Sequence, residues 1–564
     1  MIEHEDRRER NVKTNARLLV LLAALIILMP MADAYAAEDG FSSTYTYNYD
    51  YWSDIRESPD AYRVADVIYS STLGLEKAMR SPKSLFVREQ DLYIVDTGNN
   101  RILQLTKVGT QFEFVREIDH VTIGADQLDA FKAQSDLLKN EDGSVYTDEN
   151  GSFYLRPPQG SSADRGPMVL TAEGVTYFNN PNDVSVDPDG KIYVADRDNN
   201  RVIVMDKDLN YLQMFTKPAD STFDQNQSFL PNKIVVDTSG RVFVLASNIN
   251  KGLAKFEADG SFTGFIGANT VTYNLWDYIW KSYFMTKEQR SQQAAFVPTE
   301  YQNIYIDKEG FIYATNISFS EYDLLWDNAK PIRRLNAVGS DILIKNDRYP
   351  PVGDLQWVDG STDHGPSKFY DITVLDNDMY MVIDQTRGRV FGYDPQGIML
   401  WAFGTSGVPA EGAFTRAVSI EHMGKDLIVL DELNCSVTLF TPTEYGNLIY
   451  QASEQYLLGD YDGSAQTWEK VLQLNANYNL AFIGIGRSKM RTEQYKEAMD
   501  LFKMAHDRTN YGRAFRYYRK VWVEQNIWWV VVIILALVVF FFVRKTIRKV
   551  KWEVAAYEHG KVHK

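Results

Sequence analysis

Cysteine is almost missing from this sequence. Among 564 residues only Cys435 carries a thiol, so no disulfide bond can form within the chain. An exported protein of this size can be held by its core alone, and a cysteine-poor one suits a bacterial envelope better than an animal extracellular space. Because no histidine lies near it in the sequence, Cys435 is interpreted as a small apolar residue rather than a nucleophile.

Excess positive charge and catalytic signatures are missing as well. The net charge of -16 offers no basic face to nucleic acid. The sequence has no Gly-x-Ser-x-Gly turn, phosphate-binding loop or His-Glu-x-x-His helix. The run that starts at Asp196 begins like a calcium loop, but Arg201 stands where glycine is needed. We therefore expect no cofactor and no metal.

The sequence repeats itself instead. Residues 92–102 return as residues 192–202, and weaker copies of the same hairpin follow. The residue that closes the second strand of each hairpin recurs at steps of 100, 50, 70, 68 and 47 residues, at Asp96, Asp196, Ala246, Asn316, Asp384 and Asp431. The shortest steps suit one four-stranded blade, and the longer steps indicate insertions.

Six such hairpins predict a mainly β fold. A single hairpin cannot bury its apolar face, whereas six sheets packed around an axis can. We therefore expect a six-bladed β-propeller over residues 61–442, with insertions at 120–175 and 268–300. Residues 62–68 read as a strand and are expected to complete the last blade, which would close the ring.

The repeated residues resemble the NHL repeat. Its blades read roughly as proline, a strand, Asp-x-x-Gly, Ile-Tyr-Val-Ala-Asp and Asn-x-Arg-Ile, and the first two copies match this pattern closely. The third and fourth copies depart from it, with Ala246 and Asn316 at the strand-closing position and Lys251 and Glu321 in place of arginine. The resemblance covers the propeller only. It implies the propeller fold. It also leaves open an enzymatic function, since some NHL-like and lactonase-like propellers are enzymes that use carboxylate, asparagine or histidine ligands at the channel mouth.

After the propeller the apolar spacing becomes helical. Residues 459–468 are echoed by residues 493–502, and Tyr461 lies 34 residues before Tyr495, which is the tetratricopeptide period. Residues 443–525 thus resemble two tetratricopeptide units, although Asn477 stands near the usual proline, with a capping helix near residues 512–525. So short an array is expected to pack against the propeller or the membrane. It presents a groove for a partner or acts only as a spacer.

Two apolar segments indicate export and anchoring. Residues 1–36 have a basic start, an apolar stretch and an Ala-x-Ala site, which is typical of a signal peptide; an uncleaved anchor is the alternative. Residues 527–543 contain no charge and reach about 25 Å as a helix, enough for a transmembrane span. Basic residues crowd the tail 544–564, which the positive-inside rule places in the cytoplasm, with the bulk of the chain outside the cell membrane.

The strand-closing positions are the first candidates for binding. Asp96, Asp196 and Asp384 are each followed five residues later by an arginine, so these positions, with Asn316 and Asp431, could form a ring that binds a cation or a sugar. The interpretation we favour is structural, because each aspartate can accept turn N–H groups and pair with its own arginine. His120, His364, His422 and His506 are isolated in sequence, and a catalytic set built from His364, His422 and the aspartates is an alternative.

Three further segments differ from the repeats. Trp276 and Trp280 lie in a pattern over residues 270–296 that predicts an amphipathic helix, either a docking element or a cover for the propeller rim. Residues 126–166 are polar and are expected to form an exposed loop with little fixed structure. Residues 37–60 are rich in aromatics and are expected to form a strap on the propeller, with carbohydrate stacking as the alternative.

These features favour a membrane-anchored, extracytoplasmic binding or scaffold protein of the bacterial surface. Its expected partners are another envelope protein, such as a transporter, or an extracellular carbohydrate, with no nucleic acid. The alternative is a propeller hydrolase or lyase acting on an extracellular small molecule, glycan or peptide. A purely structural spacer is a third possibility.

Overall fold

The computed structural model describes residues 45–561, apart from residues 51, 53, 158–163, 226, 248, 269–300, 320–322, 325–328, 346–349, 355–365 and 409. The predicted signal peptide therefore lies outside the described residues. The same holds for Trp276, Trp280 and the amphipathic helix expected around them, and for His364.

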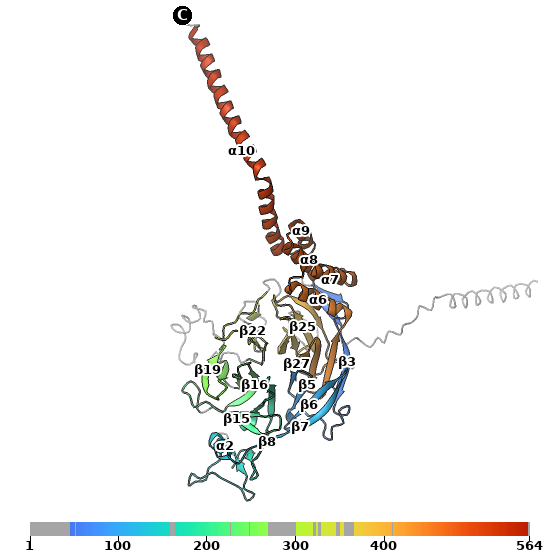
Figure 1. Cartoon of the computed structure of the whole chain (residues 1–564), viewed down its shortest axis with the longest axis vertical. Coiled ribbons are helices and arrows are strands. Elements are labelled where there is room, and N and C mark those ends of the chain that lie inside the picture. Colours follow the sequence, from blue (N-terminus) through green and yellow to red (C-terminus); the bar gives the residue numbers. More distant parts are fainter. Residues whose placement is uncertain are drawn as a thin grey trace, which may run out of the picture.

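Six antiparallel sheets surround one axis and confirm the six-bladed β-propeller (Figure 1). Each sheet is a blade whose first strand is innermost. Blade one is β4 (Ser84–Arg88), β5 (Asp91–Asp96), β6 (Arg101–Val108) and β7 (Gln111–Ile118); blade two is β12 (Pro181–Val186), β13 (Ile192–Asp196), β14 (Arg201–Met205) and β15 (Tyr211–Phe215); blade three is β16 (Leu230–Val236), β17 (Val242–Ser247), β18 (Leu253–Phe256) and β19 (Phe262–Ile266).

The remaining three blades follow the same order in the chain. Blade four, within the residues described, is β20 (Asn303–Ile306), β21 (Ile312–Thr315) and β22 (Ile332–Leu335); blade five includes β23 (Phe369–Val374), β24 (Tyr380–Asp384), β25 (Arg389–Tyr393) and β26 (Met399–Phe403); blade six includes β27 (Ala417–Met423), β28 (Asp426–Asp431) and β29 (Ser436–Pro442).

A recurring turn joins the first two strands of several blades. In blade two the Asp187 carboxylate accepts hydrogen bonds from the backbone N–H groups of Asp189 and Lys191, both at 2.9 Å, and Gly190 has a positive φ of 81°. Asp237 and Asp307 accept the matching backbone bonds in blades three and four. The Asp-x-x-Gly sequence therefore fixes the hairpins, because aspartate closes the turn and glycine tolerates the left-handed backbone.

The N-terminal part of the described chain closes the ring. Strand β3 (Tyr62–Tyr69) pairs antiparallel with β29 and becomes the outer strand of blade six, as the sequence predicted. Strands β1 (Thr46–Tyr49) and β2 (Ile55–Ser58) extend blade five to six strands, with β1 beside β26. The aromatic segment is thus part of a blade. Tyr47 is 1% exposed and donates to Asp354, so it is not available for stacking on carbohydrate.

The insertion between blades one and two has defined structure, so the expectation of a loose loop over residues 126–166 was wrong. It contains β8 (His120–Thr122), α2 (Leu128–Gln134), β9 (Phe153–Tyr154), β10 (Met168–Leu170) and β11 (Val175–Tyr177). Phe131, Leu137 and Leu155 are buried in the core that also joins blades one and two. A few apolar residues are enough to order this insertion, because the neighbouring blades supply the rest of the hydrophobic core.

A helix stack follows blade six and packs against the propeller. It consists of α6 (Glu444–Leu457), α7 (Tyr461–Leu474), α8 (Asn479–Arg491), α9 (Tyr495–Met504) and the first turns of α10 (Arg508–Lys561). One buried cluster contains both Trp401 of β26 and Tyr450 of α6, and the Tyr478 hydroxyl donates to the Leu400 carbonyl at 2.8 Å. Of the two packing surfaces that the sequence left open, the propeller or the membrane, the structure shows the propeller.

The helix hairpins follow the 34-residue spacing seen in the sequence, since α7 begins at Tyr461 and α9 begins at Tyr495. Small residues allow the close approach of neighbouring helices. A Cβ atom on Gly484 would lie 2.4 Å from the Trp468 indole nitrogen, and one on Gly486 would lie 2.7 Å from the Phe502 ring. The stack is consistent with a tetratricopeptide-like arrangement of antiparallel pairs.

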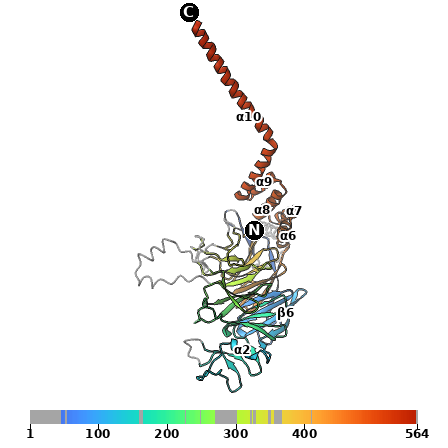
Figure 2. The same cartoon turned by 60° about the vertical axis from the view of Figure 1, so that its left-hand side comes forward.

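Helix α10 is one continuous helix of 54 residues that extends away from the rest of the protein (Figures 1 and 2). The sequence predicted a capping helix and a separate membrane span, whereas the structure joins them. The first turns pack on α9, where the rings of Tyr495 and Tyr517 stack at 5.6 Å. Among the described residues this is the one helix that is long and apolar enough to cross a membrane.

Candidate functional site

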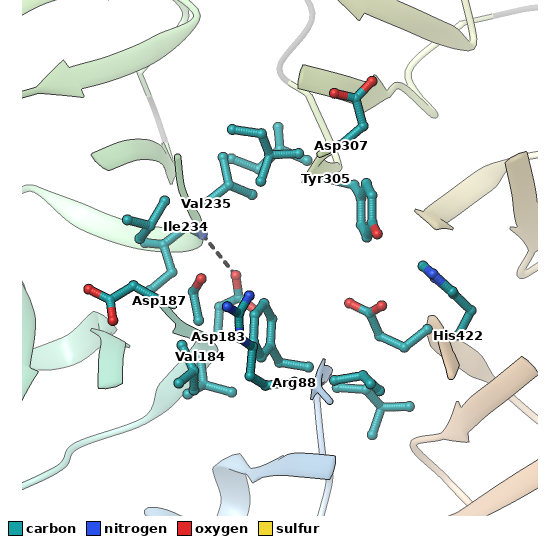
Figure 3. A pocket seen from close by; sticks show the side chains of 18 of the residues that line it. Arg88, Asp183, Val184, Asp187, Ile234, Val235, Tyr305, Asp307 and His422 are labelled. Carbon is teal, nitrogen blue, oxygen red and sulfur yellow. Dashed lines mark hydrogen bonds between the residues drawn. The ribbon is translucent and has the colours of Figure 1, made fainter. Parts of the chain in front are cut away.

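The innermost strands of all six blades line a cavity of about 440 Å³ on the propeller axis (Figure 3). One end of it is closed by buried polar side chains, which form the floor. At the other end Glu89, Thr238 and Gly424 are exposed, so the cavity opens beside the turns that follow the inner strands. Thr441, near the end of β29, donates to Asp426 at 2.7 Å in one of these turns. Helix α6 therefore starts at the same end of the propeller as the opening.

The floor is a ring with one polar residue from each blade. Its members occupy equivalent positions in the inner strands, each directly before a buried or nearly buried aliphatic residue, and all are buried. They are Ser84, Asp183, Lys233, Asn303, Asp371 and Ser419. We call these six residues the polar ring.

Hydrogen bonds join the polar ring between blades. Asp183 accepts from the Ser84 hydroxyl at 2.6 Å and from the backbone N–H of Ile234 at 2.8 Å. Asp371 repeats this pattern three blades later, accepting from the Ser419 hydroxyl at 2.7 Å and the Ile420 N–H at 2.8 Å. Its second oxygen accepts from the Asn303 amide and the Ile372 N–H. The carboxylate oxygens of the ring are thus occupied by protein donors.

Lys233 balances the two carboxylates. Its ammonium donates to Ser84 at 2.7 Å and lies 3.6 Å from Asp183. Burial raises the pKa of Asp183 and of Asp371, and the charge of Lys233 opposes that rise. Although burial opposes its charged form, the Asp183 and Asp371 carboxylates raise the pKa of Lys233. The lysine therefore stays protonated between its partners.

Blade six places two further polar side chains, Glu421 and His422, at the cavity wall, and both contact the buried Thr373 of blade five. The hydroxyl of Thr373 lies 2.7 Å from His422 Nδ1 and 3.4 Å from a carboxylate oxygen of Glu421. Burial lowers the pKa of His422 to about 4. Burial, and then the charge of Asp371, raises the pKa of Glu421 well above its usual range. His422 is therefore neutral at pH 7, and the shift of Glu421 favours its neutral form.

Arg88 reaches into the cavity from blade one. Figure 3 shows its side chain extending toward the space beside Asp183, with Tyr305 and His422 facing each other on the far wall. The Arg88 side chain is half-buried, and it makes no hydrogen bond or ion pair with any residue that the structure describes. A guanidinium presents five N–H donors, so this wall has unused donor capacity.

The predicted strand-closing residues lie outside this cavity. Asp96 accepts from Arg101 at 2.7 Å, and Asp196 accepts from Arg201 at 2.8 Å. Both carboxylates are fully buried and also accept a backbone N–H from the segment before the blade. These contacts match the structural interpretation, in which the pair fixes the turn between the second and third strands.

The other three strand-closing residues make different contacts. Asp384 accepts from the Lys368 N–H and from Arg387, whereas Arg389, its expected partner, pairs with Asp354. Asp431 accepts the N–H groups of residues 433 and 434, both at 3.0 Å, and Asn316 accepts from Ser318 at 2.8 Å. The structure does not bring the five candidates together around a ligand site.

No group of three or more histidine, cysteine, aspartate or glutamate side chains within the described ranges could hold a metal ion. Of the predicted histidines that the structure describes, His422 alone lines the cavity, and its neighbours are Thr373 and Tyr305 rather than the strand-closing aspartates. His120 lies beside Asp119 in the insertion, and His506 lies against Trp52 near the helix stack.

Sequence reasoning missed the polar ring, Arg88 and Glu421. A signal for the ring was present, because every inner strand places one serine, aspartate, lysine or asparagine directly before its aliphatic run. The repeat pattern is strongest at the end of each second strand, so it points to the strand-closing residues instead. Arg88 and Glu421 carry no repeated pattern, and only the folded ring shows that they share a cavity with His422.

One family model matches a part of the propeller. Residues 178–205, which include β12 to β14, match the family model of the NHL repeat. The protein is therefore a six-bladed β-propeller that carries an NHL repeat, followed by a helix stack ending in one long apolar helix. A comparison with curated proteins gives no match.

Several solved structures are similar at low identity. Virginiamycin B lyase from Staphylococcus aureus has 10% sequence identity and a TM-score of 0.35, covering 67% of this chain and 99% of that chain. A streptogramin B lyase has 10% identity and a TM-score of 0.33, covering 67% and 98%. A protein from Lactobacillus plantarum has 16% identity and a TM-score of 0.29, covering 59% and 87%. Similarities of this size carry no argument about activity.

Proposed function

We propose that the protein is a membrane-anchored, extracytoplasmic binding protein whose propeller cavity takes a small ligand. The observation that carries this proposal is that some charged groups of the cavity have protein partners and one does not. The carboxylates of the polar ring accept hydrogen bonds from other protein groups, whereas the Arg88 guanidinium at the wall donates none to the residues that the structure describes. A cavity of about 440 Å³ lies within the usual range of about 300–1,000 Å³ for small-molecule sites.

The anchoring part of the proposal is supported by α10. Its apolar segment is exposed along its whole length, as expected for a helix that lipid surrounds. Five basic residues follow the segment between Arg544 and Lys551, but five also precede it between Arg508 and Lys520. The external placement of the propeller therefore depends mainly on the predicted signal peptide.

The helix stack supports a scaffold role beside another envelope protein. It is fixed to the propeller by a shared core and runs directly into α10, which would hold any partner of the stack close to the bilayer. A transporter is the kind of partner that such a position favours, and an extracellular carbohydrate is the kind of ligand that the cavity favours.

The binding function can be tested with the full chain in lipid nanodiscs. Calorimetric titration with a panel of sugars, sugar acids, amino acids and short peptides is expected to find a ligand for the wild type. Thr238→Trp, which places an indole at the cavity opening, should abolish that binding. Thr263→Trp, on the exposed outer strand of the same blade, should leave it unchanged. Absence of any ligand, or equal binding by both variants, contradicts the proposal.

A lyase or hydrolase is the second candidate, and the position of His422 favours it. A neutral imidazole lies beside Glu421 in a cavity, so a base and an acid are present together. Mass spectrometry of the bound ligand after prolonged incubation separates the two functions. Recovery of intact ligand supports binding, and a product that His422→Gln no longer forms supports the enzyme.

A further inference from the structure

The cavity offers a ligand at least one strong hydrogen-bond donor that no group in the described part of the chain uses, the Arg88 guanidinium. The oxygens of Asp183 and Asp371 already accept from side chains and backbone of the neighbouring blades. The wall also carries the Arg88 guanidinium, Glu421, whose raised pKa favours the neutral form, and His422, whose pKa of about 4 keeps it neutral at pH 7. A protonated carboxyl donates one hydrogen bond, and a guanidinium donates up to five.

Three of the acidic residues near the opening have cations of their own, whereas exposed Glu89, the neighbour of Arg88 in sequence, forms no ion pair with any residue that the structure describes. Asp237 pairs with Arg241 at 2.6 Å, and Asp307 pairs with Arg334 at 3.0 Å. Asp187 accepts two backbone N–H groups and lies 3.8 Å from Lys191. These carboxylates therefore oppose an incoming anion less than their number implies, and Arg88 remains the cation in the cavity without a counterion among the described residues.

Apolar surface completes the cavity and limits what fits. Phe86 and Val235 belong to the lining between the polar ring and the opening, and Tyr305 adds an aromatic ring on the far wall. Such faces suit the carbon skeleton of a compact molecule, while Arg88 suits a planar group with two acceptor oxygens. A carboxylate matches that geometry, because guanidinium and carboxylate form two parallel hydrogen bonds.

We propose that the propeller cavity binds a small carboxylic acid rich in hydrogen-bond acceptors, such as a sugar acid, with Arg88 as the ion-pair partner of its carboxylate. This inference rests on the proposed binding function and names its ligand class. Glu421 and His422 on the cavity wall then contact the hydroxyl or carbonyl oxygens of the ligand. Lys233 acts through the polar ring and is not a direct contact.

The test uses the full chain in nanodiscs and calorimetric titration with named carboxylates. These are glucuronate, galacturonate, N-acetylneuraminate, lactate, glutamate and citrate, with glucose, galactose and the methyl ester of glucuronate as uncharged controls. At least one carboxylate should bind, and its uncharged analogue should bind at least about tenfold more weakly, because a hydrogen-bonded charge is lost.

Arg88→Gln should weaken binding of the carboxylate at least about tenfold and leave binding of an uncharged analogue almost unchanged. The variant should fold normally, since Arg88 has no partner among the described residues to lose. Arg63→Gln, at an exposed position of β3 outside the cavity lining, is the matched control and should bind like the wild type. A melting temperature equal to that of the wild type verifies folding.

The outcomes separate this inference from the binding function. If uncharged sugars bind as well as acids, or if Arg88→Gln binds the acid normally, the carboxylate assignment is overturned while the binding function stands. If none of the carboxylates binds but another molecule of the wider panel does, the assignment is likewise overturned. If no molecule binds in the cavity, the proposed binding function itself is contradicted.

Discussion

The ammonium of Lys233 donates a hydrogen bond to the hydroxyl of Ser84 at 2.7 Å, which ties blade three to blade one past blade two. Because the same lysine neutralises Asp183 and Asp371, Lys233→Met should cost about 3–5 kcal/mol of unfolding free energy. Chemical denaturation of the detergent-solubilised protein measures it. Lys191→Met removes an ammonium that is itself exposed and lies 3.8 Å from Asp187 and 3.6 Å from Asp189, so it should cost less than about 1 kcal/mol. Equal losses in the two variants contradict the role of the polar ring.

Acid should destabilise the propeller through His422. Its pKa is lowered from 6.5 to about 4, so the unfolded chain takes up a proton at a higher pH than the native protein does. Stability is therefore fully present above about pH 6.5 and is lost as the pH falls toward 4, by up to about 3 kcal/mol. His422→Gln should remove this part of the pH dependence in denaturation curves. A stability difference between wild type and variant that is constant from pH 4 to 7 would refute it.

Gly484 should tolerate no side chain. A Cβ atom there would lie 2.4 Å from the Trp468 nitrogen, and this indole is buried in the core shared with the propeller. Gly484→Ala is expected to cost about 1–3 kcal/mol. Gly512→Ala lies in α10 with nothing within 4 Å of the new atom and should be neutral or stabilising by up to about 1 kcal/mol. Thermal unfolding followed by circular dichroism compares them, and similar shifts would argue against close helix packing.

Asp196 should matter for stability rather than for ligand binding. Asp196→Asn leaves the buried guanidinium of Arg201 without its counterion, which should cost about 3–5 kcal/mol. The matched variant Asp198→Asn affects a partly exposed pair with Arg197 and should cost less than about 1 kcal/mol. Folded Asp196→Asn protein should bind the cavity ligand normally in calorimetric titration. Lost affinity at unchanged stability would instead make Asp196 a ligand contact.

The propeller was predictable because its signals are local and repeated. The Asp-x-x-Gly turns and the alternating strands are short patterns that recur, and even the closing strand β3 could be assigned from residues 62–68. The helix pairs were predictable for the same reason, through the spacing of Tyr461 and Tyr495.

What escaped prediction depends on contacts between distant segments. Phe131 and Leu155 order the first insertion only because blades one and two share their core. Arg389 pairs with Asp354 rather than with Asp384. Strand β1 brings Tyr47 and Tyr49 to that edge of blade five, where both hydroxyls donate to Asp354. Arg88, Glu421 and His422 come from opposite ends of the propeller sequence, and no spacing rule relates them.

The continuity of α10 makes the orientation of the propeller depend on residue count. A helix turns by about 100° and rises by about 1.5 Å with each residue. One alanine added between Trp522 and the apolar segment would therefore turn the propeller and helix stack about a quarter turn around the axis of α10 relative to the apolar segment, with a shift of only about 1.5 Å along that axis. A neighbour in the bilayer that must meet the helix stack would face a different side of it.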